Sequence, residues 1–160
     1  MIRDIKDDVK KVLYSEEQLA KRVKEMAEEI SKDYAGKDLL VVGILKGSVL
    51  FTSDLIKNIT IPCEIDFMAV SSYGNSAQTS GVVRILKDLD SDIENKHVLI
   101  VEDIVDTGTT LSYLLEYLKA RKAASIEIVA LLDKEARRTS NVSAKYKGFD
   151  VPDEFIVGYG

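Results

Sequence analysis

Two spacings of apolar residues divide the chain into helices and strands. After Ser15, which opens a Ser-Glu-Glu-Gln capping-box pattern, apolar residues recur every three or four positions. This spacing predicts an amphipathic helix that ends near Gly36. A second helix is expected to begin near Ser48. A third, with leucines along one face, is expected from Thr110 onward.

Short apolar runs of strand length lie between these helices. They occupy 38–45, 63–73, 97–104 and 125–134, and one further strand is expected soon after residue 81. The run at 97–104 starts with consecutive apolar residues, as is typical of a central parallel strand that is covered on both faces. Because strands and helices alternate, we predict an α/β fold with a central, mainly parallel sheet flanked by helices and right-handed crossovers.

The length of 160 residues favours a single domain over 1–160. The alternation of strands and helices is limited to a core of about 36–135. We expect the flanking segments, about 1–14 and 136–160, to form a small hood over the carboxyl edge of the sheet.

Composition narrows the class of protein. Apolar residues make up 46% of the chain, charged residues 31%, and the net charge is −5, which argues against nucleic acid as the default partner. Cys63 is the only cysteine, so no intrachain disulfide can form. Residues 1–14 lack the apolar core of a signal peptide, and no run approaches the roughly 20 apolar residues of a membrane helix. We therefore expect a cytoplasmic protein with no nucleic-acid or membrane partner.

Three loops with unusual chemistry follow strands. They contain Lys46-Gly47-Ser48, the stretch Glu102–Thr110, and Asp133-Lys134. Open α/β sheets bind ligands beyond the carboxyl ends of their strands, so these loops are expected to converge on one site.

The turn Thr107-Gly108-Thr109-Thr110 has the properties of a phosphate cradle. Its small residues let backbone N–H groups approach a ligand, and the helix that starts there directs its positive end to the same place. Gly108 is not followed by Lys, and neither the Walker A nor the dinucleotide spacing is present. Taken alone, the turn is explained equally well by an ordinary helix cap.

Three acids precede this turn and make a ligand site the better interpretation. Glu102 and Asp103 suit ribose hydroxyls, or Mg²⁺ held by those hydroxyls. Asp106 suits a proton acceptor, or a group that stabilises positive charge on a sugar carbon. The alternative is that all three acids cap the turn and face water.

Two lysines in the other loops allow two interpretations each. Lys46, beside the close-approach turn at Gly47, suits a diphosphate but is equally a solvated lysine. Lys134 suits a donor to a carbonyl oxygen, but an ion pair with Asp133 explains it as well.

At this point the motifs resemble a known family. VLIVEDIVDTGTTL resembles the 5-phosphoribosyl-1-pyrophosphate (PRPP) signature of type I phosphoribosyltransferases. GILKGS, DFMAVSSYG, LLDK and PDEFIVGYG, in that order, resemble the bacterial hypoxanthine-guanine phosphoribosyltransferase family, and the likeness runs from about residue 10 to the end. The acidic signature marks the superfamily, while LLDK and PDEFIVGY indicate 6-oxopurines.

The resemblance implies a role for each motif. Glu102 and Asp103 hold the ribose hydroxyls, partly through Mg²⁺, and Asp106 lies near purine N7 as general base or acid. The 5-phosphate is wrapped by five residues: Asp106, Thr107, Gly108, Thr109 and Thr110. The pyrophosphate loop is Leu45, Lys46 and Gly47, where the family often has a non-proline cis peptide bond.

The resemblance also implies how the base is bound. Ser72 and Tyr73 lie on a mobile loop that closes over the reacting centre. Lys134 donates to the purine 6-oxo group, Phe155 stacks on the base, and the backbone of Ile156 reads its edge.

The implied activity is purine salvage. Hypoxanthine or guanine plus PRPP gives IMP or GMP plus pyrophosphate, with Mg²⁺ as cofactor and a homodimer or homotetramer as the assembly. The alternatives are a phosphoribosyltransferase for xanthine or a pyrimidine, or an RNA-binding regulator of the same fold that responds to nucleotides. The regulator requires a basic face, and only two small basic groups are present: Lys119, Arg121 and Lys122, and the pair Arg137 and Arg138.

The chain departs from the family pattern in one place. Members of the family normally continue past the GYG-like ending into a tail that supplies a metal-contacting aspartate and an arginine near the pyrophosphate. The sequence stops at Gly160. We expect this difference to affect the second metal site and full activity more than the 5-phosphate and purine sites.

Overall fold

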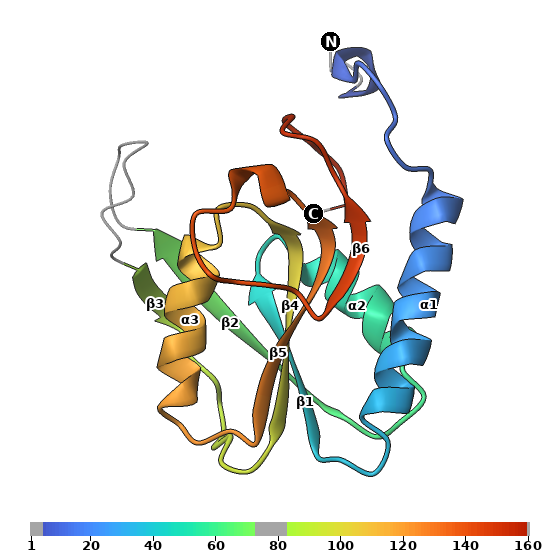
Figure 1. Cartoon of the computed structure of the whole chain (residues 1–160). Coiled ribbons are helices and arrows are strands. Elements are labelled where there is room, and N and C mark those ends of the chain that lie inside the picture. Colours follow the sequence, from blue (N-terminus) through green and yellow to red (C-terminus); the bar gives the residue numbers. More distant parts are fainter. Residues whose placement is uncertain (1–4, 73–82, 160) are drawn as a thin grey trace.

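A computed structural model of the chain describes residues 5–72 and 83–159, and its elements follow the predicted alternation (Figure 1). In chain order they are η1 (Ile5–Asp8), α1 (Glu16–Asp33), β1 (Leu39–Leu45), α2 (Val49–Asn58), β2 (Glu64–Ser72), β3 (Val83–Lys87), β4 (His97–Val105), α3 (Thr109–Lys119), β5 (Ser125–Asp133), η2 (Glu135–Arg137) and β6 (Tyr146–Asp150). The predicted capping box at the start of α1 is present, because Ser15 Oγ accepts from Gln18 N while Gln18 Oε1 accepts from Ser15 N.

The six strands form one sheet in the order β3-β2-β1-β4-β5-β6. All neighbouring pairs are parallel except β2 and β3, which confirms the expected mainly parallel sheet. The chain first adds strands on one side of β1 and then returns to its other side with β4. The carboxyl ends of β1 and β4 therefore mark the switch point at which open α/β sheets form their ligand crevice.

Helices cover both faces of the sheet, as Figure 1 shows, with α3 on one side and α1 and α2 on the other. Successive strand residues point to opposite faces, so β1 contributes Leu40 to the cluster under α3 and Val41 to the cluster under α1 and α2. Both clusters consist of buried, mostly aliphatic side chains, and this close packing makes the sheet a rigid platform for the loops at its carboxyl edge.

One strand was not predicted. β6 lies in the stretch that was expected to belong to the hood, and it pairs in parallel with β5 at the edge of the sheet. The range proposed for the hood, 136–160, therefore includes a strand of the main sheet. Above the carboxyl edge lie η2 and the part after Asp150 (Figure 1).

The N-terminal region covers the free edge of β6. Arg22 of α1 donates to the carbonyls of Lys147 and Gly148, at 2.7 and 3.1 Å. Tyr14 donates to the carbonyl of Asp150 at 3.2 Å and stacks on Phe149 with ring centroids 4.0 Å apart. These side chains satisfy edge carbonyls that would otherwise be open to another strand. No helix among the described residues is long and apolar enough to cross a membrane.

Candidate active site

The acids and the phosphate turn form one open pocket at the predicted switch point. Its volume is about 150 Å³. It is lined by Glu102, Ile104, Val105, Asp106, Thr107, Gly108, Thr110 and Leu111. These residues end β4 and begin α3, so the pocket has carboxylates on one wall and the N-terminus of a helix on the other.

The turn before α3 is shaped to receive an anion. Gly108 is the N-cap of α3, has φ +82, and provides no side-chain cap, so the first amides of the helix lack a hydroxyl partner from the N-cap residue. The Thr107 hydroxyl donates to the Thr109 hydroxyl at 3.3 Å. It also accepts from the backbone N–H of Thr109, at a long 3.4 Å. The turn is therefore not an ordinary Thr cap, and its geometry suits a phosphate group.

Glu102 and Asp103 are neighbours on β4, and their side chains are close enough to interact with each other. Glu102 lines the pocket, where solvent reaches it only through the opening, and burial together with the charge of Asp103 raises its pKa well above 4.5. Asp103 lies against the pyrophosphate loop, because a Cβ on Gly47 would be 2.8 Å from its Oδ2. A bound cation would lower the cost of placing these two negative charges together.

The donor set agrees with a magnesium ion that is held jointly by protein and substrate. The described residues contain no group of three or more acidic, His or Cys side chains that could hold a metal alone. Mg²⁺ usually binds through one or two carboxylates plus substrate oxygens, which is what Glu102 and Asp103 can offer.

Asp106, the expected proton-transfer residue, faces an arginine that was not predicted. Arg137 Nε lies 2.9 Å from Asp106 Oδ1, and Arg137 also reaches Asp153 Oδ1 at 3.4 Å. Asp106 Oδ1 is buried and accepts no hydrogen bond from the described residues, because the Arg137 contact is close but lacks the direction of a hydrogen bond. The Asp106 side chain as a whole is 44% exposed, so a ligand in the pocket can still reach its carboxyl group.

The expected pyrophosphate loop lies beside this pocket. The Leu45–Lys46 peptide bond is cis, as the family resemblance implied. Lys46 is exposed, and the loop passes so close to Asp103 that only glycine fits at position 47. A cation and a carboxylate are therefore next to each other at the switch point.

The expected purine-binding residues lie at the end of β5 and in the C-terminal segment. Lys134 is only 7% exposed, and its ammonium group makes no hydrogen bond or ion pair with the described residues. Its neighbour Asp133 pairs with Arg138 instead, so the suggested Asp133–Lys134 ion pair is absent. Phe155 is 93% exposed and Ile156 is half-buried. A buried donor and an open aromatic face are suitable for a flat base with a carbonyl oxygen.

The remaining expected residue pair cannot be placed as a unit. Ser72 ends β2, next to β1 in the sheet. Tyr73 and the rest of the expected mobile loop, 73–81, lie outside the described residues.

Sequence reasoning treated Arg137 and Arg138 as a small basic group that could serve an RNA-binding surface. In the structure both are occupied by acids, Arg137 by Asp106 and Asp153, and Arg138 by Asp133. Of the second basic group, Arg121 pairs with Asp88 at 3.0 Å and Lys119 with Glu116 at 3.2 Å. Four of the five basic side chains on which the regulator hypothesis relied are therefore paired with acids.

Comparison with known proteins gives one consistent result. The model of the phosphoribosyl transferase domain family matches residues 10–160. The hypoxanthine-guanine phosphoribosyltransferase of Bacillus subtilis strain 168 is 52% identical over 156 residues, which are 98% of this chain and 87% of that protein. The protein of the same name from Staphylococcus aureus strain Mu50 is 54% identical over 154 residues, 96% of this chain and 86% of that one.

The structural comparison agrees with the sequence comparison. A crystal structure of a hypoxanthine phosphoribosyltransferase from Staphylococcus aureus has a TM-score of 0.96 and 53% identity. The matched region is 100% of this chain and 87% of the Staphylococcus aureus chain. The similarity extends over the whole sheet and the carboxyl edge, and it confirms the fold expected from the sequence motifs.

Proposed function

This chain belongs to the phosphoribosyltransferase family, in its hypoxanthine-guanine branch, and from that premise we propose that it transfers the phosphoribosyl group of PRPP to hypoxanthine or guanine. The products are IMP or GMP and pyrophosphate, so the enzyme serves purine salvage. One observation carries the proposal: a single pocket joins Glu102 and Asp106 to the glycine turn at the start of α3.

The reaction forms one bond and breaks another at C1 of the ribose. A purine ring nitrogen attacks C1, the bond from C1 to the pyrophosphate oxygen breaks, and the purine gives up a proton. The transition state has oxocarbenium character, by analogy with other glycosyl transfers. Carboxylates beside the ribose stabilise this positive charge, and Glu102 and Asp106 line the pocket where it would develop.

Asp106 is the residue proposed to move the proton. Its side chain lines the pocket and is 44% exposed, so its carboxyl group can accept a proton from the purine or share one with N7. Arg137 holds the carboxylate from the opposite direction and keeps it in place before the base arrives.

Binding of the two phosphate groups is divided between two loops. We assign the 5-phosphate to Thr107–Thr110 and the pyrophosphate to Leu45, Lys46 and Gly47. Mg²⁺, when bound with PRPP, would neutralise the leaving pyrophosphate, and Glu102 and Asp103 are the carboxylates available to hold it together with the ribose hydroxyls. Lys46 adds a cation on the same side.

The preference for a 6-oxopurine rests on Lys134, Phe155 and Ile156. Lys134 is only 7% exposed and its ammonium group has no protein partner among the described residues, so it is available to donate to a carbonyl oxygen. Phe155 supplies a face for stacking, and the Ile156 backbone supplies hydrogen bonds for the edge of the base.

We further propose a cytoplasmic enzyme that assembles as a homodimer or homotetramer and binds neither nucleic acid nor membranes. The free thiol of Cys63 suits a reducing compartment. The exposed apolar side chains of Ile65, Leu86 and Tyr113 support contacts between subunits.

The test is a panel of bases offered with PRPP and Mg²⁺. We expect IMP from hypoxanthine and GMP from guanine, with much slower turnover of xanthine and uracil, as measured by chromatography of the nucleotide products. Lys134→Gln should raise KM for hypoxanthine and leave KM for PRPP unchanged. A protein that binds PRPP but prefers a pyrimidine would overturn the assignment of Lys134, and one that does not bind PRPP would overturn the whole proposal.

A further inference from the structure

A short segment after η2 packs against the back of the phosphate turn. This backing segment, Arg138–Ser140, was read from the sequence as part of a polar loop. It makes four hydrogen bonds to two successive carbonyl groups of the turn. Arg138 Nε donates to the carbonyl of Asp106 at 3.1 Å, and Thr107 O accepts from Thr139 N at 3.0 Å, Ser140 Oγ at 3.0 Å and Thr139 Oγ1 at 3.5 Å.

These bonds determine which way the peptide groups of the turn face. In a trans peptide unit the C=O and the following N–H point in opposite directions. The units after Asp106 and Thr107 are trans. Because their carbonyls are held on the backing side, the N–H groups of Thr107 and Gly108 point the other way, toward the pocket that both residues line. Without this restraint a carbonyl could turn inward and repel a phosphate.

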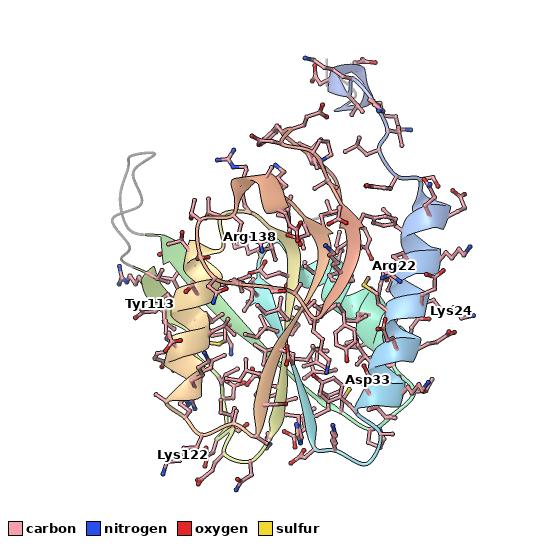
Figure 2. All side chains as sticks on the ribbon, in the orientation of Figure 1. Arg22, Lys24, Asp33, Tyr113, Lys122 and Arg138 are labelled. Atoms are coloured by element: carbon pink, nitrogen blue, oxygen red, sulfur yellow. The ribbon has the colours of Figure 1, made fainter. Side chains whose placement is uncertain are left out.

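Arg138 is anchored firmly enough to act as a restraint. Its side chain is 15% exposed and its guanidinium also binds the carboxylate of Asp133, which is 3% exposed, and the carbonyl of Val142. Figure 2 shows Arg138 at the carboxyl edge of the sheet, near the start of α3. Three acceptors in different directions require the planar fork of an arginine, which a lysine ammonium cannot replace in geometry.

The backing segment also explains the glycine in the turn. A Cβ on Gly108 would lie 2.4 Å from Ser140 Oγ and 3.1 Å from Arg138 Cδ. The backing segment therefore leaves no room for a side chain at Gly108, so a change in either segment disturbs the other at this residue.

We propose that Arg138 and Ser140 are positioning residues for the 5-phosphate of PRPP. They act through the backbone of Asp106 and Thr107, contact no substrate, and keep the amides of the turn facing the ligand. This inference rests on the proposed function, since the turn is taken to bind the 5-phosphate. It gives the polar segment after η2 a role in binding that its own side chains do not perform directly.

The experiment compares Ser140→Ala and Arg138→Lys with wild-type enzyme by steady-state kinetics and by equilibrium binding of GMP. For Ser140→Ala we expect KM for PRPP and Kd for GMP to rise by about two- to tenfold, which is the loss of one hydrogen bond in the restraint. Arg138→Lys should raise both by at least about tenfold, because a compact ammonium cannot reach the widely separated acceptors that the planar guanidinium group spans. KM for hypoxanthine should change by less than about twofold.

Ser143→Ala is the matched control. It removes the same kind of hydroxyl group from an exposed residue of the same loop. It should leave every constant unchanged. If Ser140→Ala changes KM for PRPP and KM for hypoxanthine equally, or changes neither, the positioning role is wrong. Arg138→Lys disturbs a buried ion pair and could unfold the protein, but Ser140→Ala keeps that pair and decides the question alone.

The outcomes separate this inference from the proposed function. A wild-type protein that makes IMP and binds GMP, combined with a Ser140→Ala variant of unchanged PRPP affinity, refutes only the positioning role. A wild-type protein that neither binds GMP nor makes IMP refutes the function, and the positioning role with it.

Discussion

The two halves of the site differ in how completely the unliganded protein prepares them. On the phosphate side, the turn at Gly108 is held from behind by hydrogen bonds and by direct packing against Ser140. On the base side, Phe155 is 93% exposed and Val157 is 61% exposed, although Tyr159 of the same segment packs against the core. Only Lys134 is buried there.

This difference matches what each half has to recognise. The phosphoribosyl group is the constant part of the reaction, so a rigid cradle can bind it at little cost in conformational entropy. The base is flat and is proposed to stack on Phe155, so an exposed aromatic face can receive it. The comparison teaches that the fold preorganises mainly the turn that is proposed to bind the charged phosphate. The stacking surface is provided by Phe155, an exposed residue of the C-terminal segment.

The largest effect on activity is expected from Asp106, which lies between the phosphate half and the base half of the site. Asp106→Asn keeps the shape but removes the proton acceptor, so kcat should fall by roughly 100- to 10,000-fold while KM for PRPP changes little. Stopped or continuous assays of IMP formation measure this. Asp153→Asn removes the other carboxylate on Arg137 and is the control, expected to lower kcat less than about threefold. Comparable losses in both variants would mean that Arg137, not Asp106, matters.

The next effect tests the rigidity of the phosphate half. Gly108→Ala adds a Cβ that would lie 2.4 Å from Ser140 Oγ at a residue with φ +82. We expect about 1–2 kcal/mol of lost stability from the backbone conformation and an increase in KM for PRPP of at least about tenfold.

Gly36→Ala is a close control for this variant. Gly36 has φ +76, but a Cβ there would meet nothing within 4 Å. It should lose a similar amount of stability in thermal unfolding and keep the PRPP affinity of wild type. If both variants bind PRPP equally well, the packing against Ser140 does not shape the cradle.

A smaller effect is expected on the open half. Phe155→Ala should raise KM for hypoxanthine by about fivefold or more, since stacking of a base on an aromatic ring contributes about 1–3 kcal/mol. Its unfolding free energy should change by less than about 0.5 kcal/mol, because the ring is exposed. Val157→Ala, which trims another exposed side chain of the same segment, should change neither value. A large loss of stability in Phe155→Ala would show that the base side is packed and not open.

The two halves also differ in how well the sequence predicts them. The strand at 97–104, the acids behind it and the glycine turn were all visible because apolar periodicity and motif spacing are local properties. The backing by Arg138 and Ser140 was not visible, since two adjacent arginines in a polar stretch look like a solvated surface. The partners of these two residues depend on the order of the strands. Because β5 lies next to β4 in the sheet, the residues after β5 lie beside the turn after β4.

β6 was missed for a related reason. Its five residues include Gly148 and two charged side chains, so neither composition nor alternation indicates a strand. Its stability comes from distant partners, such as Arg22, which lies 126 residues before Gly148 in the chain. Edge elements that depend on such contacts cannot be recognised from local pattern alone.

The smallest expected effect is on stability, and it comes from the buried carboxyl group of Glu102 in the phosphate half of the site. Burial and the charge of Asp103 raise the pKa of Glu102 well above its ordinary value of 4.5. The folded protein therefore holds a proton more tightly than the unfolded chain, and stability falls as the pH rises from about 4.5 through the raised pKa. Above that window the ionised Glu102 continues to destabilise the fold.

Glu102→Gln removes this titration. The substrate-free variant should melt a few degrees higher than wild type at pH 8 and at the same temperature below pH 4, as measured by calorimetry across that range. Asp153→Asn, an exposed carboxylate, should show no such pH-dependent difference. A variant less stable than wild type at pH 8 would mean that Glu102 is satisfied within the fold. In that case the ionised Glu102 would not destabilise the substrate-free fold, and substrate binding would have no such destabilisation to relieve. The rigidity of the phosphate half would then reflect ordinary packing and not preparation for a ligand.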